Sequence, residues 1–250
     1  MKAEVKGSTL PVLEIQLDPG EAVVSDHGEL AWMSPTIQMT QKTSTGGKGG
    51  LMAGLKRVAG GASIFLTEYL AGGGEGRVTF ATHLPGTILP VDIEPARAMI
   101  VHRSGWVCGT PGISPTVAFQ QNFGGALFGG EGFILQRLEG EGKAWIELSG
   151  EVTQYALEPG EVLLAHPGHI GMFDQSVQFT ITTVPGIKNK IFGGDGIFLV
   201  RLTGPGQVWL QSLTLPGLAA SLAPYLAHND NAGPSGGRGL GGIVGNILNQ

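Results

Sequence analysis

Several features that narrow the function of a protein are missing from this chain of 250 residues. It has one cysteine, Cys108, so no disulfide can form within it. No window reaches about eighteen uninterrupted apolar residues, which leaves no candidate for a membrane-spanning helix. Residues 1–6 lack the apolar stretch of a secretory signal peptide. These absences predict a protein of a reducing compartment, with a cytoplasmic location.

Charged and aromatic side chains are also scarce. Charged residues make up 14% of the chain, against roughly 25% in an ordinary soluble domain, and the net charge is −5. Nucleic-acid binding needs a basic surface, and sequence-tolerant binding of single strands also needs aromatic rings beside the cations. Aromatic residues make up only 7%, and Trp145 and Trp209 occupy matching positions of the repeat described below, which favours a structural role. The composition therefore disfavours RNA binding, which is an alternative function only by the fold analogy described below.

Glycine, by contrast, is abundant, with 43 residues that fall mostly in pairs and short clusters between apolar runs. They follow no three-residue period, which excludes collagen. The apolar runs are short and many alternate with polar residues, as in Gln178–Val184, which is typical of half-buried strands. This pattern predicts an all-β protein, and glycine turns such as Gly140–Gly142 and Gly204–Gly206 are predicted to close hairpins.

Three segments of the chain are similar to one another. Each reads apolar, acidic, proline, small, charged and then an apolar run, and the three are Leu17–Val24, Ile93–Ile100 and Leu157–Leu164. Their Pro-Gly or Pro-Ala pairs suit a tight turn.

Two further landmarks follow in the same order. A Gly-Gly segment recurs as Gly60–Leu66, Gly129–Leu135 and Gly193–Leu199. A strand-like segment recurs as Arg77–Phe80, Lys143–Ile146 and Gln207–Leu210. We therefore predict three tandem β-sandwich-like repeats in a compact, pseudo-threefold arrangement that shares one interior.

The spacing of the landmarks gives the predicted boundaries. The repeats are 13–92, 93–156 and 157–215, followed by a short helix at 216–228 and a flexible glycine-rich tail at 229–250. Pro224 is expected to limit the helix to two turns, and residues 187–192 to form one helical turn. Residues 240–248 are more apolar than a solvated tail. Either this segment associates weakly or is disordered, or it docks on a partner or a membrane surface.

Some of these motifs resemble a known family. Gly54–Arg57 with Gly60–Gly61, Phe173–Val177, Phe192–Gly196 and Gly204–Gln211 are similar to segments of the altered-inheritance-of-mitochondria family. Its bacterial members were formerly a domain of unknown function. The resemblance implies a repeated β-sandwich similar to the subunit of the tryptophan RNA-binding attenuation protein, and assembly into trimers. It implies no agreed activity and no catalytic residues.

His166 and His169 are the best candidates for metal ligands. Zinc and iron sites combine imidazoles with a carboxylate, and Glu161 and Asp174 are near in sequence. A metal-dependent barrel enzyme centred on the two histidines is therefore an alternative function. The Pro-Gly pair between them favours the other interpretation, that both are turn residues at the surface.

Other chemistry has weaker candidates. Ser104, Ser114 and Thr116 lack a nucleophile-elbow pattern, with only His102 nearby, and Cys108 reads as a small buried apolar residue. The Gly46–Gly50 run lacks the ending of a phosphate-binding loop. The sequence thus assigns no catalytic, cofactor-binding or metal residue. It predicts a non-enzymatic, homo-oligomeric scaffold or binding protein of unknown ligand, without a cofactor.

Overall fold

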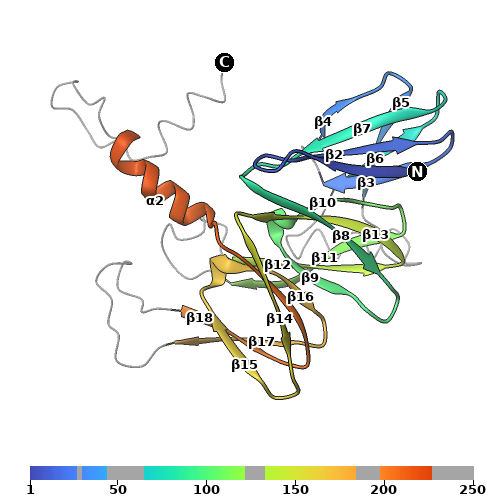
Figure 1. Cartoon of the computed structure of the whole chain (residues 1–250). Coiled ribbons are helices and arrows are strands. Elements are labelled where there is room, and N and C mark those ends of the chain that lie inside the picture. Colours follow the sequence, from blue (N-terminus) through green and yellow to red (C-terminus); the bar gives the residue numbers. More distant parts are fainter. Residues whose placement is uncertain (27–29, 44–64, 122–132, 184–197, 227–250) are drawn as a thin grey trace. The chain divides into compact units, whose positions relative to one another are not determined.

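A computed structural model of the chain describes residues 1–26, 30–43, 65–121, 133–183 and 198–226 (Figure 1). These residues form antiparallel strands, with two short 3-10 turns and one α-helix. The predicted all-β class is confirmed.

The strands after β1 (Lys2–Lys6) fall into three sets of six. The first set is β2 (Val12–Leu17), β3 (Ala22–Asp26), β4 (Leu30–Met33), β5 (Ile37–Thr43), β6 (Phe65–Ala71) and β7 (Gly76–Ala81). The second is β8 (Gly86–Ile93), β9 (Met99–His102), β10 (Trp106–Gly109), β11 (Ile113–Gln121), β12 (Phe133–Gly140) and β13 (Gly142–Ser149). The third is β14 (Val152–Leu157), β15 (Val162–Ala165), β16 (Ile170–Asp174), β17 (Gln178–Thr183), β18 (Phe198–Thr203) and β19 (Gly206–Gln211).

The pairing within each set follows one order. The sixth strand pairs with the first and the third, and the fifth strand pairs with the second and the fourth. Each set therefore contributes two half-sheets of three strands. Asp18, Glu94 and Glu158 all lie in the turn between the first and second strands of their sets.

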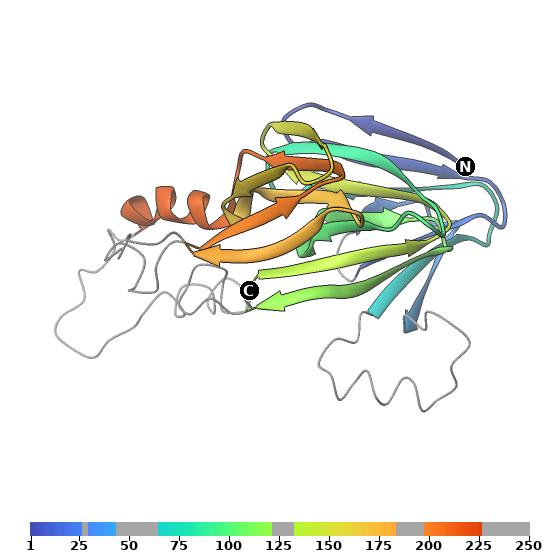
Figure 2. The same cartoon turned by 90° about the horizontal axis from the view of Figure 1, so that it is seen from below.

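Successive sets are joined by pairing at strand edges. The second strand of one set pairs with the third strand of the next, as β3 with β10 and β9 with β16. Two six-stranded sheets result, in the orders β5-β6-β3-β10-β13-β8 and β11-β12-β9-β16-β19-β14. The unjoined half-sheets are β1-β2-β7-β4 in the first set and β15-β18-β17 in the third. Figures 1 and 2 show the sheets as successive layers.

Three apolar cores lie between successive sheets. The first contains Phe80 edge-on to Tyr69, with 5.4 Å between ring centroids. In β13, Ala144, Ile146 and Leu148 all belong to the second core and so share one face of the strand. Trp145, on the opposite face of the same strand, belongs to the first core. Each six-stranded sheet is therefore buried on both faces, which explains the low content of charged residues in the chain.

The predicted turns form where the landmarks place them. The Glu21 N–H donates to the carbonyl of Asp18 at 2.9 Å, and the Glu161 N–H to that of Glu158 at 2.9 Å. Gly20 and Gly160 adopt φ of 86° and 82°, the left-handed region that glycine accepts most readily.

The predicted hairpins at Gly140–Gly142 and Gly204–Gly206 are wrong, because the strands on either side belong to different sheets. At Gly140–Gly142 the chain turns a corner from one sheet to the next. Gly140 has φ of 116°, and a Cβ there would clash with the carbonyl oxygen of Gly112. Glycine is required equally by a hairpin and by such a corner, so composition alone does not distinguish them.

The described residues up to Pro216 form one compact unit, and the described residues from Gly217 onward belong to a second. Helix α2 (Leu215–Leu226) has 12 residues and continues past Pro224, so the predicted limit of two turns is wrong. Proline in the last turn of a helix removes one backbone hydrogen bond, but its fixed φ is compatible with the helical conformation. None of the helices in the described ranges has both the length and the apolar character to cross a membrane.

The repeat boundaries and the pseudo-threefold arrangement stay predictions. The Gly-Gly landmarks, the helical turn at 187–192, the Gly46–Gly50 run and the tail at 229–250 lie wholly or mainly outside the described residues.

The corner at Gly140 gives a first test of the fold. Gly140→Ala is expected to lower the free energy of unfolding by about 3 kcal/mol, because it adds a steric clash to the strain of a positive φ. Gly160→Ala is the matched control, since its Cβ meets nothing within 4 Å; only the strain of about 1–2 kcal/mol is expected. Urea unfolding followed by tryptophan fluorescence measures both. Equal losses would contradict the crowded corner.

Candidate functional site

His166 directly precedes a short 3-10 turn, Pro167–His169, and His169 is its last residue. His166 Nδ1 accepts a hydrogen bond from the Gly168 N–H at 3.3 Å, and His169 Nδ1 lies 2.8 Å from the carbonyl oxygen of Gln211. Burial, and to a lesser degree the neighbouring His169, lowers the pKa of His166. The two rings are near each other, with 5.9 Å between centroids.

The carboxylates suggested for this site are bound elsewhere. Glu161 accepts from the Glu158 N–H at 2.8 Å, and Asp174 pairs with Arg97 at 3.2 Å. Across the part of the chain that the structure describes, no cluster of three His, Cys, Asp or Glu side chains is suited to a metal ion. The two histidines are brought together, but their predicted partners are not.

The candidate nucleophiles are likewise separated. Cys108 is fully buried in β10, and Ser114 and Thr116 lie in β11. His102 directs its Nε2 to the carbonyl oxygen of Glu147 at 3.2 Å. Burial lowers the pKa of His102 to about 4, so the ring is neutral at pH 7. It therefore serves as a hydrogen-bonding group within the fold.

Glu147 is a buried carboxylate that the sequence analysis missed. It lies in β13 and accepts hydrogen bonds from the N–H groups of His83, at 3.1 Å, and Leu84, at 3.3 Å. Both donors belong to the segment that connects the first and second sets. Its position in an alternating strand was visible in the sequence, but the burial of that face was not.

Gln211 occupies the position of Glu147 in the third set. Its Oε1 accepts at 3.0 Å from the N–H of Ser149, the last residue of β13. An acceptor at this position thus binds backbone N–H groups near the end of the preceding set. The recurrence assigns Glu147 a structural role.

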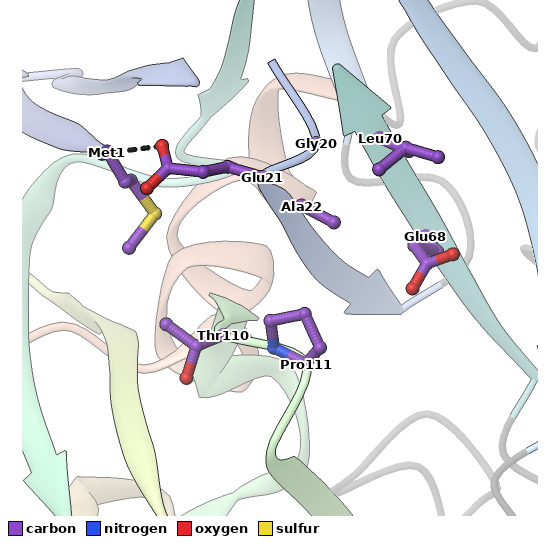
Figure 3. A pocket seen from close by; sticks show the side chains of 8 residues that line it. All are labelled: Met1, Gly20, Glu21, Ala22, Glu68, Leu70, Thr110 and Pro111. Carbon is purple, nitrogen blue, oxygen red and sulfur yellow. Dashed lines mark ion pairs between the residues drawn. The ribbon is translucent and has the colours of Figure 1, made fainter. Parts of the chain in front are cut away.

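A pocket of about 450 Å³ opens at the junction of β3 and β10 (Figure 3). The Met1 ammonium group pairs with Glu21 at 2.5 Å, while Thr110 and Pro111 line the pocket from the second set. The hydrogen bond with Glu21 is the main cause of the raised pKa of that ammonium group. At the junction of β9 and β16, Arg97 and Asp174 hold the positions of Glu21 and Thr110 and form an ion pair. The pocket thus marks a junction that lacks this ion pair.

Two edge strands differ from the others in composition. Within the described ranges the four sheets have eight edge strands, and six of these contain proline, charged or amide side chains. The six are β1, β5, β8, β11, β14 and β17. By contrast, β4 reads Leu-Ala-Trp-Met and β15 reads Val-Leu-Leu-Ala. Native proteins usually protect a free edge with polar or charged side chains or proline, and these two strands have none.

The side chains of these two strands are also exposed. Trp32 in β4 is 54% exposed, whereas Cys108 and Met172, at the same position of the other third strands, are buried. Leu164 in β15 is 52% exposed, whereas Val24 and Ile100, its counterparts in the other second strands, are buried. Pairing with a neighbouring set accounts for the difference. The edges of β4 and β15 are therefore the candidate interaction site.

The buried carboxylate gives a second test. Burial raises the pKa of Glu147 above its ordinary value of 4.5, so the folded protein keeps this proton to a higher pH than the unfolded chain. The protonated Glu147 side chain therefore adds to the free energy of unfolding below pH 4.5, and this contribution is lost as the pH rises through the raised pKa. Glu147→Gln keeps an acceptor, as Gln211 does, without this loss.

We expect the free energy of unfolding of Glu147→Gln, relative to the unmodified protein, to rise between about pH 4 and pH 8. Urea unfolding at several pH values measures it, and Glu4→Gln, on the exposed strand β1, is the control. A difference that does not change with pH, or that changes in the opposite direction, would show that burial does not dominate the environment of this carboxylate.

The comparisons with known proteins agree with this fold. The family described as "Mitochondrial biogenesis AIM24" matches residues 3–213. The uncharacterized protein M6_Spy0233 of Streptococcus pyogenes serotype M6 is 25% identical over 225 residues, which cover 88% of this chain and 89% of that protein. The crystal structure of protein SPYM3_0169 from Streptococcus pyogenes superimposes with a TM-score of 0.69 at 22% identity, covering 90% of this chain and 99% of that one. The predicted resemblance is confirmed, and the chain belongs to the AIM24 family.

Proposed function

We propose that the protein is a homo-oligomeric scaffold or binding protein, which assembles through its exposed apolar strand edges. The observation that carries the proposal is the exposure of Trp32 and Leu164 at positions whose counterparts are buried by pairing. The proposal assigns the protein no reaction.

Two physical terms favour association at these edges. An unpaired edge leaves a row of backbone N–H and C=O groups available to another strand. The exposed apolar side chains add about 25 cal/mol for each Å² removed from water. Since β4 and β15 provide both, burying them is favourable once the entropy of association is met.

The internal similarity of the chain supports the same proposal. One pairing order recurs in three sets, as expected if a unit was triplicated and each copy kept the edges that bind its neighbours. The compact pseudo-threefold arrangement is part of this proposal. So are the cytoplasmic location and the docking of the tail at 229–250 on a partner or a membrane surface.

Oligomerisation is tested on the full chain by multi-angle light scattering over a range of concentrations. The expected result is a mass well above the 25.9 kDa of one chain. This mass should increase with protein concentration until assembly is complete. A mass of one chain at every concentration would contradict the proposed function.

A further inference from the structure

We propose that β15 of one copy pairs antiparallel with β4 of the next copy, so that the chains assemble head to tail. The inference rests on the proposed function and names both the partner and the contact. It follows from the rule by which the three sets of one chain are joined.

The rule uses the same two strands at each junction. The second strand of a set pairs with the third strand of the following set, as β3 with β10 and β9 with β16. In the described residues this leaves the third strand of the first set, β4, and the second strand of the third set, β15, without such a partner. These are also the two wholly apolar edges.

The two unjoined half-sheets are complementary. In each six-stranded sheet, one half consists of the fourth, fifth and second strands of a set, and the other half of the third, sixth and first strands of the next set. The sheet β17-β18-β15 has the order of the former half. The sheet β4-β7-β2 has the order of the latter, with β1 added at its outer edge. Pairing β15 with β4 would therefore produce a third sheet with the order of the existing two. The remaining free edges would be β17 and β1, which are polar.

The local backbone of β4 suits this pairing. The register against β7 shifts between Leu30 and Trp32, and a bulge can protect a free edge. The same shift occurs between Trp106 and Cys108 in β10, and in β16 as well. Both β10 and β16 contain this bulge and still pair with a strand of the preceding set. The bulge in β4 therefore does not prevent such pairing.

The register of the proposed contact follows from the existing junctions. Gly109 opposes Val24 at the first junction, and Phe173 opposes Ile100 at the second. The counterparts of these pairs are Met33 and Leu164. Met33 should therefore oppose Leu164 of the next copy, and Trp32 should oppose Ala165.

Charge does not oppose the contact. At the second junction Arg97 and Asp174 face each other as an ion pair. Their counterparts in the proposed contact are Glu161 and Ser34, so the one charged group faces a hydroxyl group. No like charges are brought together at this end.

The contact joins different copies. Figure 1 shows β4 and β15 at opposite ends of the series of sheets in the unit Met1–Pro216, too far apart to pair within one chain. A contact between two different surfaces is heterologous, and it gives a ring if the rotation closes or a filament if it does not.

Complementation between two edge variants tests the direction of assembly. Trp32→Lys should block β4 and leave β15 intact, and Leu164→Lys should do the reverse. Head-to-tail pairing predicts that each full-length variant alone is monomeric in sedimentation velocity, and that an equimolar mixture forms dimers and nothing larger. Met39→Lys, on edge strand β5 and 49% exposed in the unmodified chain, is the matched control and should assemble normally.

The outcomes separate the two proposals. Restored pairing in the mixture also shows that both variants are folded. If either variant alone still dimerises, an edge pairs with its own copy or another surface is used, which overturns the inference but leaves oligomerisation standing. If the unmodified chain is monomeric, both proposals fail.

Disulfide cross-linking tests the register of the proposed contact between β4 and β15. With Met33→Cys and Leu164→Cys in one chain, mild oxidation should give a covalent ladder on a non-reducing gel, because opposed Cβ atoms in antiparallel strands lie within reach of a disulfide. Each single variant, and Met33→Cys with Val162→Cys, two residues out of register, should give at most a trace. Equal ladders from the matched and the mismatched pairs would overturn the predicted register.

Discussion

Backbone pairing between the second strand of one set and the third strand of the next is the constraint on which this structure depends. It occurs at β3 with β10 and at β9 with β16, and it converts half-sheets of three strands into sheets of six. A unit of this size has little interior of its own. Pairing at the edges lets each half-sheet share its neighbour's core, so the three cores form one continuous series.

The composition of the chain is a consequence of this arrangement. Strands of the six-stranded sheets face a core on both sides, as Ala144 and Trp145 do in β13, and little surface is left for charged groups. Polar side chains at the junctions are retained where they bind backbone N–H groups near the end of the preceding set, as Glu147 and Gln211 show. Exposed apolar side chains on β4 and β15 are then an exception that calls for a physical cause, which an intermolecular junction provides.

Sequence reasoning could predict the all-β class, the turns at Gly20 and Gly160, and the family. These depend on local patterns and on internal similarity. It did not predict that Gly140–Gly142 turns a corner, since the assignment of strands to sheets depends on pairing between distant residues. Nor did it identify Trp32 or Leu164, although the alignment of Leu164 with Val24 and Ile100 was available. Three similar strands have different exposure only because the first and third sets each lack one neighbour.

Hydrogen–deuterium exchange of the backbone amides in the full-length protein, at a concentration where it is assembled, tests the central claim most directly. If edge pairing joins copies as it joins sets, the amides of β4 and β15 will be protected to a degree similar to those of β3 and β10, and their protection will fall on dilution. Rapid exchange in β4 and β15 at every concentration, as expected of open edges, would contradict the account.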